Sequence, residues 1–203
     1  MAEKPFAPSA ERNREPILAA LRPRLADRCR LLEIGSGTGQ HAVHCAPELP
    51  HLVWQTSERP LQLPGLRLWL EEAGLANTPP PLALDMDDAD WPERAGGAVH
   101  DAMFSANTLH IMAWSTVVAW FAALPRALAP GGRLMVYGPF IEPDRPTAES
   151  NLRFDDQLRR SAPHQGLRRL DEVDAVARCA GLVRLERIEM PANNLLMVWE
   201  QQA

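Results

Sequence analysis

Cysteine is scarce in this sequence, and no cysteine pattern with a structural use is visible. The three thiols are Cys29, Cys45 and Cys179, and no two of them form a Cys-x-x-Cys pair. An odd number of widely separated cysteines is not a disulfide framework, which indicates a reducing, cytoplasmic setting. We expect each cysteine to be a small buried apolar residue rather than a nucleophile or a metal ligand, and we predict no metal site.

Long apolar runs and basic runs are missing as well. No stretch approaches the ~20 residues that cross a bilayer, and residues 1–10 lack the apolar centre of a secretory signal. Lys4 is the only lysine, the arginines are dispersed, and the net charge is -5. A nucleic-acid partner normally requires a basic patch, so we expect neither a nucleic-acid nor a membrane partner.

What remains is the composition of an ordinary globular domain. Hydrophobic residues make up 46% and charged residues 23% of the 203 residues, which suits a single domain spanning residues 1–203. Within it, residues 1–28 read as an N-terminal arm followed by a helix, with Pro16 near the helix start.

Short apolar runs alternate with amphipathic segments along the chain, and this alternation predicts the fold class. Strands are expected at 30–34, 52–56, 82–84, 102–106, 133–137, 183–188 and 195–200; helices are expected at 17–25, 40–46, 66–73, 117–128 (disturbed at Pro125) and 171–181. Strands alternating with helices indicate a parallel α/β sheet with helices on both faces. The last two strands require a hairpin, so one strand near the C-terminus should be antiparallel. Ligands of such sheets bind beyond the carboxyl ends of the strands.

A glycine-rich loop follows the first predicted strand. The chain reads Glu33-Ile34-Gly35-Ser36-Gly37-Thr38-Gly39, and its glycines permit a tight turn that a ligand can approach closely. The dinucleotide fingerprint G-x-G-x-x-G would need glycine where this sequence has Gln40, and the Lys-Ser/Thr pair of a P-loop is absent. These differences disfavour an NAD-linked oxidoreductase and a P-loop nucleoside triphosphatase.

The segment E-I-G-S-G-T-G resembles motif I of class I S-adenosylmethionine (SAM)-dependent methyltransferases. This resemblance implies a Rossmann-like fold with a seven-stranded, mostly parallel sheet, and SAM as cofactor with S-adenosylhomocysteine (SAH) as product. It implies that the loop formed by Gly35, Ser36, Gly37 and Gly39 passes under the methionine part of SAM. It also implies that Glu33 lies near the amino group, often through water.

Three further positions fit a nucleoside cofactor. Glu58 follows the second strand, and an acidic residue there suits a ribose diol, because one carboxylate accepts from two hydroxyls. Asp85 and Met86 follow the third strand, where the resembled family usually has its adenine-contacting acid. Asn107 leaves the fourth strand beside the expected cofactor.

A closer resemblance covers nearly the whole chain. It rests on six blocks: SAERNREPIL at 9–18, GSGTGQHA at 35–42, FSANTLHI at 104–111, YGPF at 137–140, SNLRFD at 150–155 and MPANN at 190–194. Together they are similar to an uncharacterised family called methyltransferase-like protein 26. The resemblance implies SAM binding but names no methyl acceptor, and it assigns no role to Tyr137, Asn151 or Asp155.

The catalytic candidates are Asn107 and His110. If residues 107–110 make one helical turn, both side chains lie on one face. Asn107 then faces the cofactor or orients the acceptor, and His110 acts as a general base, since its unperturbed pKa is near neutrality. The alternative for His110 is a structural histidine beneath a loop.

Other polar positions admit two interpretations each. Arg12 and Asn13 belong either to a charged helix start or to an arm that folds over the cofactor. Asp155 and Asp156 form either a carboxylate site or a solvated helix face, and Asn193-Asn194 reads as a two-residue hairpin turn, with substrate contact as the alternative. His41 and His44 read as polar surface.

The function expected from these observations is methyl transfer from SAM to a small-molecule acceptor. No Asn/Asp-Pro-Pro-Tyr sequence follows the fourth strand, which disfavours methylation of nucleic-acid amino groups. The alternatives are a SAM- or SAH-binding protein without catalysis and the disfavoured NAD-linked oxidoreductase. The sequence makes no prediction of the oligomeric state.

Overall fold

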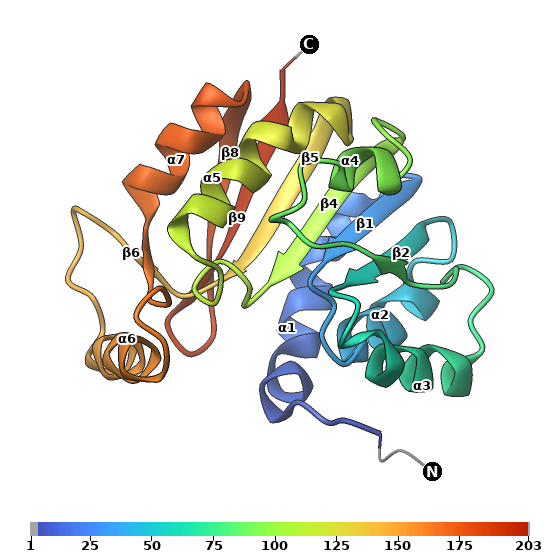
Figure 1. Cartoon of the computed structure of the whole chain (residues 1–203), viewed down its shortest axis with the longest axis horizontal. Helices are drawn as coiled ribbons and strands as arrows, with labels where there is room; N and C mark the ends of the chain where they lie inside the picture. Colours follow the sequence, from blue (N-terminus) through green and yellow to red (C-terminus); the bar gives the residue numbers. More distant parts are fainter. Residues whose placement is uncertain (1–3, 203) are drawn as a thin grey trace.

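The computed structural model describes residues 4–202 and contains one seven-stranded sheet within them (Figure 1). The strand order is β3-β2-β1-β4-β5-β9-β8. In that order the strands are β3 (Leu82–Ala83), β2 (Val53–Glu58), β1 (Arg30–Ile34), β4 (His100–Ala106), β5 (Leu128–Gly138), β9 (Asn194–Gln201) and β8 (Leu182–Met190). Only β9 runs against the others in this sheet, because it pairs antiparallel with both β5 and β8. The expected mostly parallel sheet with one antiparallel strand near the C-terminus is confirmed.

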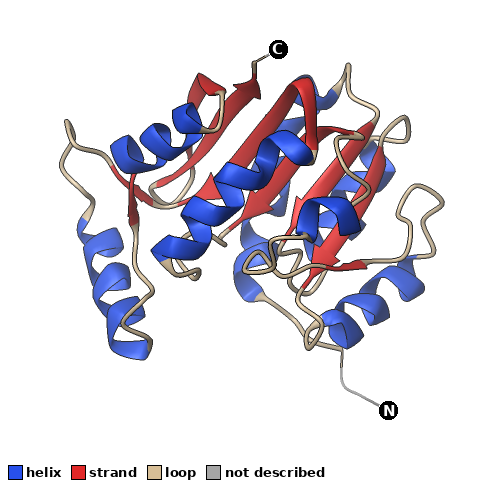
Figure 2. Ribbon diagram, turned by 45° about the horizontal axis from the view of Figure 1, so that its top comes forward, coloured by secondary structure: helices blue, strands red, loops and turns tan. Residues whose placement is uncertain are grey.

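Helices cover both faces of the sheet (Figure 2). One face is covered by α1 (Pro8–Leu25), α2 (Gln40–Cys45) and α3 (Leu63–Ala73), and the other by α4 (Trp91–Arg94), α5 (Trp114–Ala123) and α7 (Leu170–Cys179). Successive strand residues point to opposite cores: Leu31 packs with the first group of helices and Leu32 with the second. Two 3-10 turns, η1 (Ala46–Glu48) and η2 (Leu124–Arg126), follow α2 and α5.

A smaller unit extends from the end of β5. It comprises β6 (Phe140–Ile141), α6 (Glu149–Ser161) and β7 (Arg168–Arg169), with β6 and β7 paired in parallel. Figure 1 shows α6 at one end of the molecule, beside the turn between β8 and β9. Asn151 of α6 donates a hydrogen bond to the carbonyl of Asn193 in that turn, at 2.9 Å.

Several boundaries differ from those expected. The first helix begins at Pro8, so Pro16 lies inside it; the start signal is Pro8 itself, because proline at the first helical position loses no hydrogen bond. The β8–β9 turn spans 191–193, with Ala192 and Asn193 both at φ 58°, so Asn194 already belongs to β9.

The burial of the cysteines differs in part from the expectation. Cys45 is buried as expected, whereas Cys29 and Cys179 are exposed.

Apolar helical segments of membrane-spanning length do not occur among residues 4–202. The part of the fold that bears on function is the edge where β1, β2, β3 and β4 end. The parallel pairing of these strands brings the loops that follow them to that common edge.

Candidate functional site

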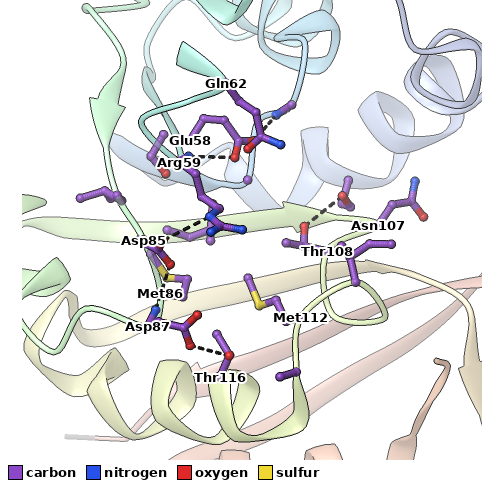
Figure 3. A pocket seen from close by; sticks show the side chains of 18 of the residues that line it. Glu58, Arg59, Gln62, Asp85, Met86, Asp87, Asn107, Thr108, Met112 and Thr116 are labelled. Atoms are coloured by element: carbon purple, nitrogen blue, oxygen red, sulfur yellow. Dashed lines mark hydrogen bonds and ion pairs between the residues drawn. The ribbon is translucent and has the colours of Figure 1, made fainter. Parts of the chain in front are cut away.

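A cavity of about 630 Å³ lies at the carboxyl ends of β1 to β4 (Figure 3). Each of the four strand ends contributes to it: Gly35 and Gly37 after β1, Glu58 as the last residue of β2 with Arg59 and Gln62 after it, Asp85, Met86 and Asp87 after β3, and Asn107, Thr108, Ile111 and Met112 after β4. Ala113, Thr116 and His164 also line the cavity. The fold thus brings together around one cavity residues as far apart in the sequence as Gly35 and His164.

The glycine loop uses its glycines for two different reasons. Gly37 has φ 57°, and a Cβ atom added there would meet no atom within 4 Å, so it borders open space. Gly39 has φ 89°, and a Cβ atom there would lie 2.6 Å from Leu66 Cδ1, so it permits close packing against α3. Gly35 and Gly37 line the cavity, whereas Gly39 is a packing residue outside the lining.

Glu58 holds this loop in place. Its Oε2 accepts a hydrogen bond from the Gly37 backbone N–H at 2.7 Å, and its Oε1 accepts from the Arg59 N–H at 2.8 Å. A carboxylate has about four acceptor positions, so both oxygens can accept further hydroxyl hydrogens from the cavity. Because Gly37 already donates to a carboxylate, its N–H is not free to bind a phosphate.

The loop after β3 is acidic and is tied to its neighbours. Asp85 Oδ2 accepts from Arg59 Nε at 3.1 Å, and Asp87 Oδ1 accepts from Thr116 Oγ1 at 2.5 Å (Figure 3). The cavity is therefore lined by three carboxylates, Glu58, Asp85 and Asp87, and by the guanidinium of Arg59. This excess of negative charge favours a cationic ligand over an anionic one.

Glu33 and Ser36 lie behind the glycine loop and outside the cavity lining. Glu33 is 1% exposed; its Oε2 accepts from Trp54 Nε1 at 2.9 Å and from Ser36 Oγ at 3.0 Å. Burial raises the pKa of Glu33 to about 7; the charge of Glu58 adds to this effect, and the two hydrogen bonds oppose it. Its Oε1 lies 4.0 Å from His41 Nδ1.

The residues predicted as a cofactor-covering arm are part of α1. Arg12 is exposed, and neither Arg12 nor Asn13 lines the cavity. Asn13 Oδ1 accepts from His41 Nε2 at 2.8 Å. His41 is therefore a buried link between α1 and α2, not polar surface as predicted, and burial lowers its pKa to about 4.

The predicted helical turn from Asn107 to His110 is wrong. Asn107 has φ 58°, which no right-handed helix contains, and the turn begins at Thr108, whose carbonyl accepts from Ile111 and Met112. Asn107 lines the cavity, whereas His110 is not among the lining residues and is 5% exposed. The two side chains nevertheless converge: Asn107 Oδ1 and His110 Nδ1 each lie 3.8 Å from where a Cβ of Gly138 would be.

His110 is surrounded by the smaller unit of the fold. Its ring packs edge-to-face on Phe154 of α6, with centroids 5.3 Å apart, and its carbonyl accepts from the Gly166 N–H at 3.0 Å. Burial lowers the pKa of His110 to about 4, and the charge of Arg168 contributes to this lowering. The imidazole is therefore neutral at pH 7, and it is a weaker base than the near-neutral pKa expected from the sequence would make it.

The polar residues of α6 serve the loop that follows it. Asp155 accepts from the Leu167 N–H at 2.7 Å and from Arg159 Nε at 2.9 Å, so it shapes that loop. Asp156 pairs with Arg160 on an exposed helix face. Between residues 4 and 202, no cluster of three or more His, Cys, Asp or Glu side chains is arranged to hold a metal ion.

Part of the cavity lining was not predicted from the sequence. Some of the lining residues follow predicted positions in the same loops, and their location after a strand end could have indicated them: Arg59, Gln62 and Asp87. Thr116 and His164 carried no signal, because only the packing of α5 and of the loop after α6 brings them to the cavity.

The fold is shared with known methyltransferases. An O-methyltransferase family protein from Burkholderia thailandensis matches with a TM-score of 0.81 at 18% identity, covering 96% of this chain and 58% of its own. Human N-acetylserotonin methyltransferase in complex with SAM matches with a TM-score of 0.79 at 16% identity, covering 96% and 53%. PigF with SAH matches with a TM-score of 0.78 at 21% identity, covering 96% and 64%. The chain thus spans little more than half the length of the first two.

These likenesses establish the class I, Rossmann-like methyltransferase fold. Within that fold class, the chain belongs to the family described as protein of unknown function, DUF938, which matches residues 4–201.

Proposed function

We propose that this protein transfers the methyl group of SAM to a small-molecule acceptor. The proposal depends on one observation: the carboxyl ends of β1, β2, β3 and β4 surround a single cavity and supply it with the Gly35–Gly37 turn and the carboxylates of Glu58 and Asp85. SAM- and SAH-bound proteins among the structural neighbours support the choice of cofactor.

The charges of the cavity favour SAM over NAD. SAM carries a sulfonium and an ammonium group, and the lining offers Glu58, Asp85 and Asp87 against one guanidinium. NAD carries a pyrophosphate, which needs free backbone N–H groups at the glycine turn. The Gly37 N–H instead donates to Glu58, so a pyrophosphate there would displace a carboxylate and face its charge.

In this proposal, different residues of the cavity bind different parts of SAM. Glu58 accepts from the ribose hydroxyls, Asp85 accepts from the adenine amino group, and the Gly35–Gly37 turn leaves room for the chain that joins ribose to methionine. SAM supplies an already activated methyl group, so the protein chiefly has to align the acceptor and exclude water. Asn107 orients the acceptor, and the neutral imidazole of His110, which converges with Asn107 on Gly138, takes up its proton.

Calorimetry with SAM, SAH and NAD tests the proposal. We expect SAM and SAH to bind with micromolar affinity and NAD not to bind; the opposite ranking would refute the proposal. Gly37→Val should abolish SAH binding because its side chain enters the cavity. Gly74→Val is a matched control: Gly74 has φ 58° and, like Gly37, nothing within 4 Å of an added Cβ, but it ends α3 away from the cavity. Equal SAH affinity in both variants would remove the glycine turn from the site.

Turnover separates an enzyme from a binding protein without catalysis. Incubation of the wild-type protein with SAM and fractionated metabolite extract should release SAH in at least one fraction. SAM binding with no SAH release in any fraction would favour the non-catalytic alternative.

A further inference from the structure

Arg168 is a buried cation that, within residues 4–202, forms no ion pair. The residue is 9% exposed, and its guanidinium donates to three backbone carbonyls. Nε donates to Leu109 O at 3.0 Å, and Nη2 donates to His164 O at 3.0 Å and to Met112 O. The neighbouring Arg169 is different, because it is half exposed and pairs with Asp171 and Glu172.

Burying a guanidinium without a carboxylate partner is costly, because carbonyl dipoles replace only part of its hydration. The nearby ring of Trp114, 5.9 Å from Arg168 Cζ, offsets a further part. Burial also lowers the pKa of Arg168. An arginine in such surroundings needs a structural or functional reason. The location of its three carbonyl acceptors indicates what that reason is.

The three carbonyls belong to two segments that are distant in the sequence and adjacent in space. Leu109 and Met112 lie in the turn after β4, which carries the cavity-lining residues Ile111 and Met112. His164 lies in the loop after α6 and also lines the cavity. A further bond, from the Gly166 N–H to His110 O at 3.0 Å, joins the same two segments.

The 109–112 turn held by Arg168 adjoins, through α5, the loop after β3. Met112 is followed by α5, and Thr116 of α5 bonds to Asp87 beside the proposed adenine position. Figure 3 shows Met112 and Thr116 on the side of the cavity where Asp85, Met86 and Asp87 lie. A displacement of the 109–112 turn would therefore change the space available to a purine base.

We propose that Arg168 is a positioning residue: its guanidinium ties the 109–112 turn to the loop at His164 and thereby sets the wall of the cavity against which the adenosine part of the cofactor binds. This inference rests on the proposed function for the identity of the ligand. The tie between the two segments is independent of that function.

Three variants test the proposal: Arg168→Met, Arg168→Lys and the control Arg169→Met. The probes are SAH and 5′-methylthioadenosine, which lacks the amino-acid part. Arg168→Met should weaken both by about tenfold or more, since hydrogen bonds from a charged donor are lost. Arg168→Lys should lie between it and the wild type, because an ammonium cannot reproduce the planar fork of donors. Arg169→Met should equal the wild type.

Hydrogen exchange of the ligand-free proteins provides a readout that does not need the cofactor. The amides of Ile111, Met112 and Gly166 should exchange faster in Arg168→Met and Arg168→Lys than in Arg169→Met, with thermal midpoints measured alongside. If Arg168→Met does not fold, Arg168→Lys carries both measurements.

The outcomes separate the two proposals. Failure of the wild type to bind either probe refutes the proposed function, while local exchange still tests the tie. Wild-type exchange in these amides together with wild-type affinity in folded Arg168 variants overturns the inference. A loss confined to SAH, with 5′-methylthioadenosine unaffected, also overturns it, because the wall would then serve the amino-acid end.

Discussion

Replacing Glu33 with glutamine removes a carboxyl group that the fold buries completely, while keeping its shape. Trp54 Nε1 and Ser36 Oγ donate to Glu33 Oε2, and an amide oxygen can accept both hydrogen bonds. The variant should therefore fold and keep its packing. What it loses is the free-energy cost of ionising a carboxyl away from water.

The magnitude follows from the pKa of Glu33. The fold raises it from 4.5 to about 7, so the folded protein holds the proton more tightly than the unfolded chain. Such a group stabilises the fold below the unfolded pKa, and this contribution is lost as pH rises through 7. One pKa unit corresponds to about 1.4 kcal/mol, so Glu33→Gln should be more stable than the wild type by about 3 kcal/mol at pH 8. The gain should shrink below about 1 kcal/mol at pH 5.

Urea denaturation followed by circular dichroism from pH 5 to 8.5 measures this difference. His41 and His110, whose pKa values burial lowers to about 4, act in the opposite direction below pH 6.5 but do so in both proteins. Glu71→Gln, on the exposed side of α3, is the control and should follow the wild type at every pH. Parallel stability profiles for wild type and Glu33→Gln would refute the reasoning and place the ionised carboxylate in a well-solvated setting.

Three further expectations concern the site. Glu58→Ala should weaken SAM binding by about 1.5–3 kcal/mol in calorimetry, because one carboxylate accepting two hydroxyls is lost; an unchanged dissociation constant would remove Glu58 from the site. Hydrogen exchange over residues 6–16 should slow when SAH is added, since Asn13 connects α1 through His41 to the helix behind the glycine loop; identical exchange with and without SAH would leave α1 a structural element only. His110→Ala should lower turnover by ~10²–10⁴-fold with SAH affinity kept, once an acceptor is known; full turnover would make His110 structural.

The sequence predicted the fold because its signals are local. The run 30–34 contains three large apolar residues, is followed by a glycine and is β1 with the same bounds. Gly35, Gly37, Glu58, Asp85 and Asn107 were placed at strand ends by periodicity, and parallel pairing then brings strand ends together. No knowledge of side-chain contacts was needed for this step.

The rest of the site depends on contacts that no local pattern encodes. The side of the strand on which Glu33 lies is visible in the alternation, but its bonds to Trp54 and Ser36 are not. Asn107 was predicted to begin a helical turn, and its left-handed backbone is visible only in the structure, where the turn begins at Thr108. No sequence pattern singles out Arg168, because its three carbonyl partners come from two loops that are distant in the sequence.

The position of β9 has a consequence for how the molecule is made. This strand lies between β5 and β8, yet it follows β8 in the chain. During synthesis β8 therefore emerges with no neighbour to pair with, and it joins the sheet only when Asn194–Gln201 has been inserted against β5. The carbonyl of Asn193, which accepts the hydrogen bond from Asn151 of α6, is also placed only at this late step. A nascent chain halted before β9 would thus already contain the glycine loop after β1 but would lack the contact that holds α6. The unpaired edge of β5 would be open to aggregation.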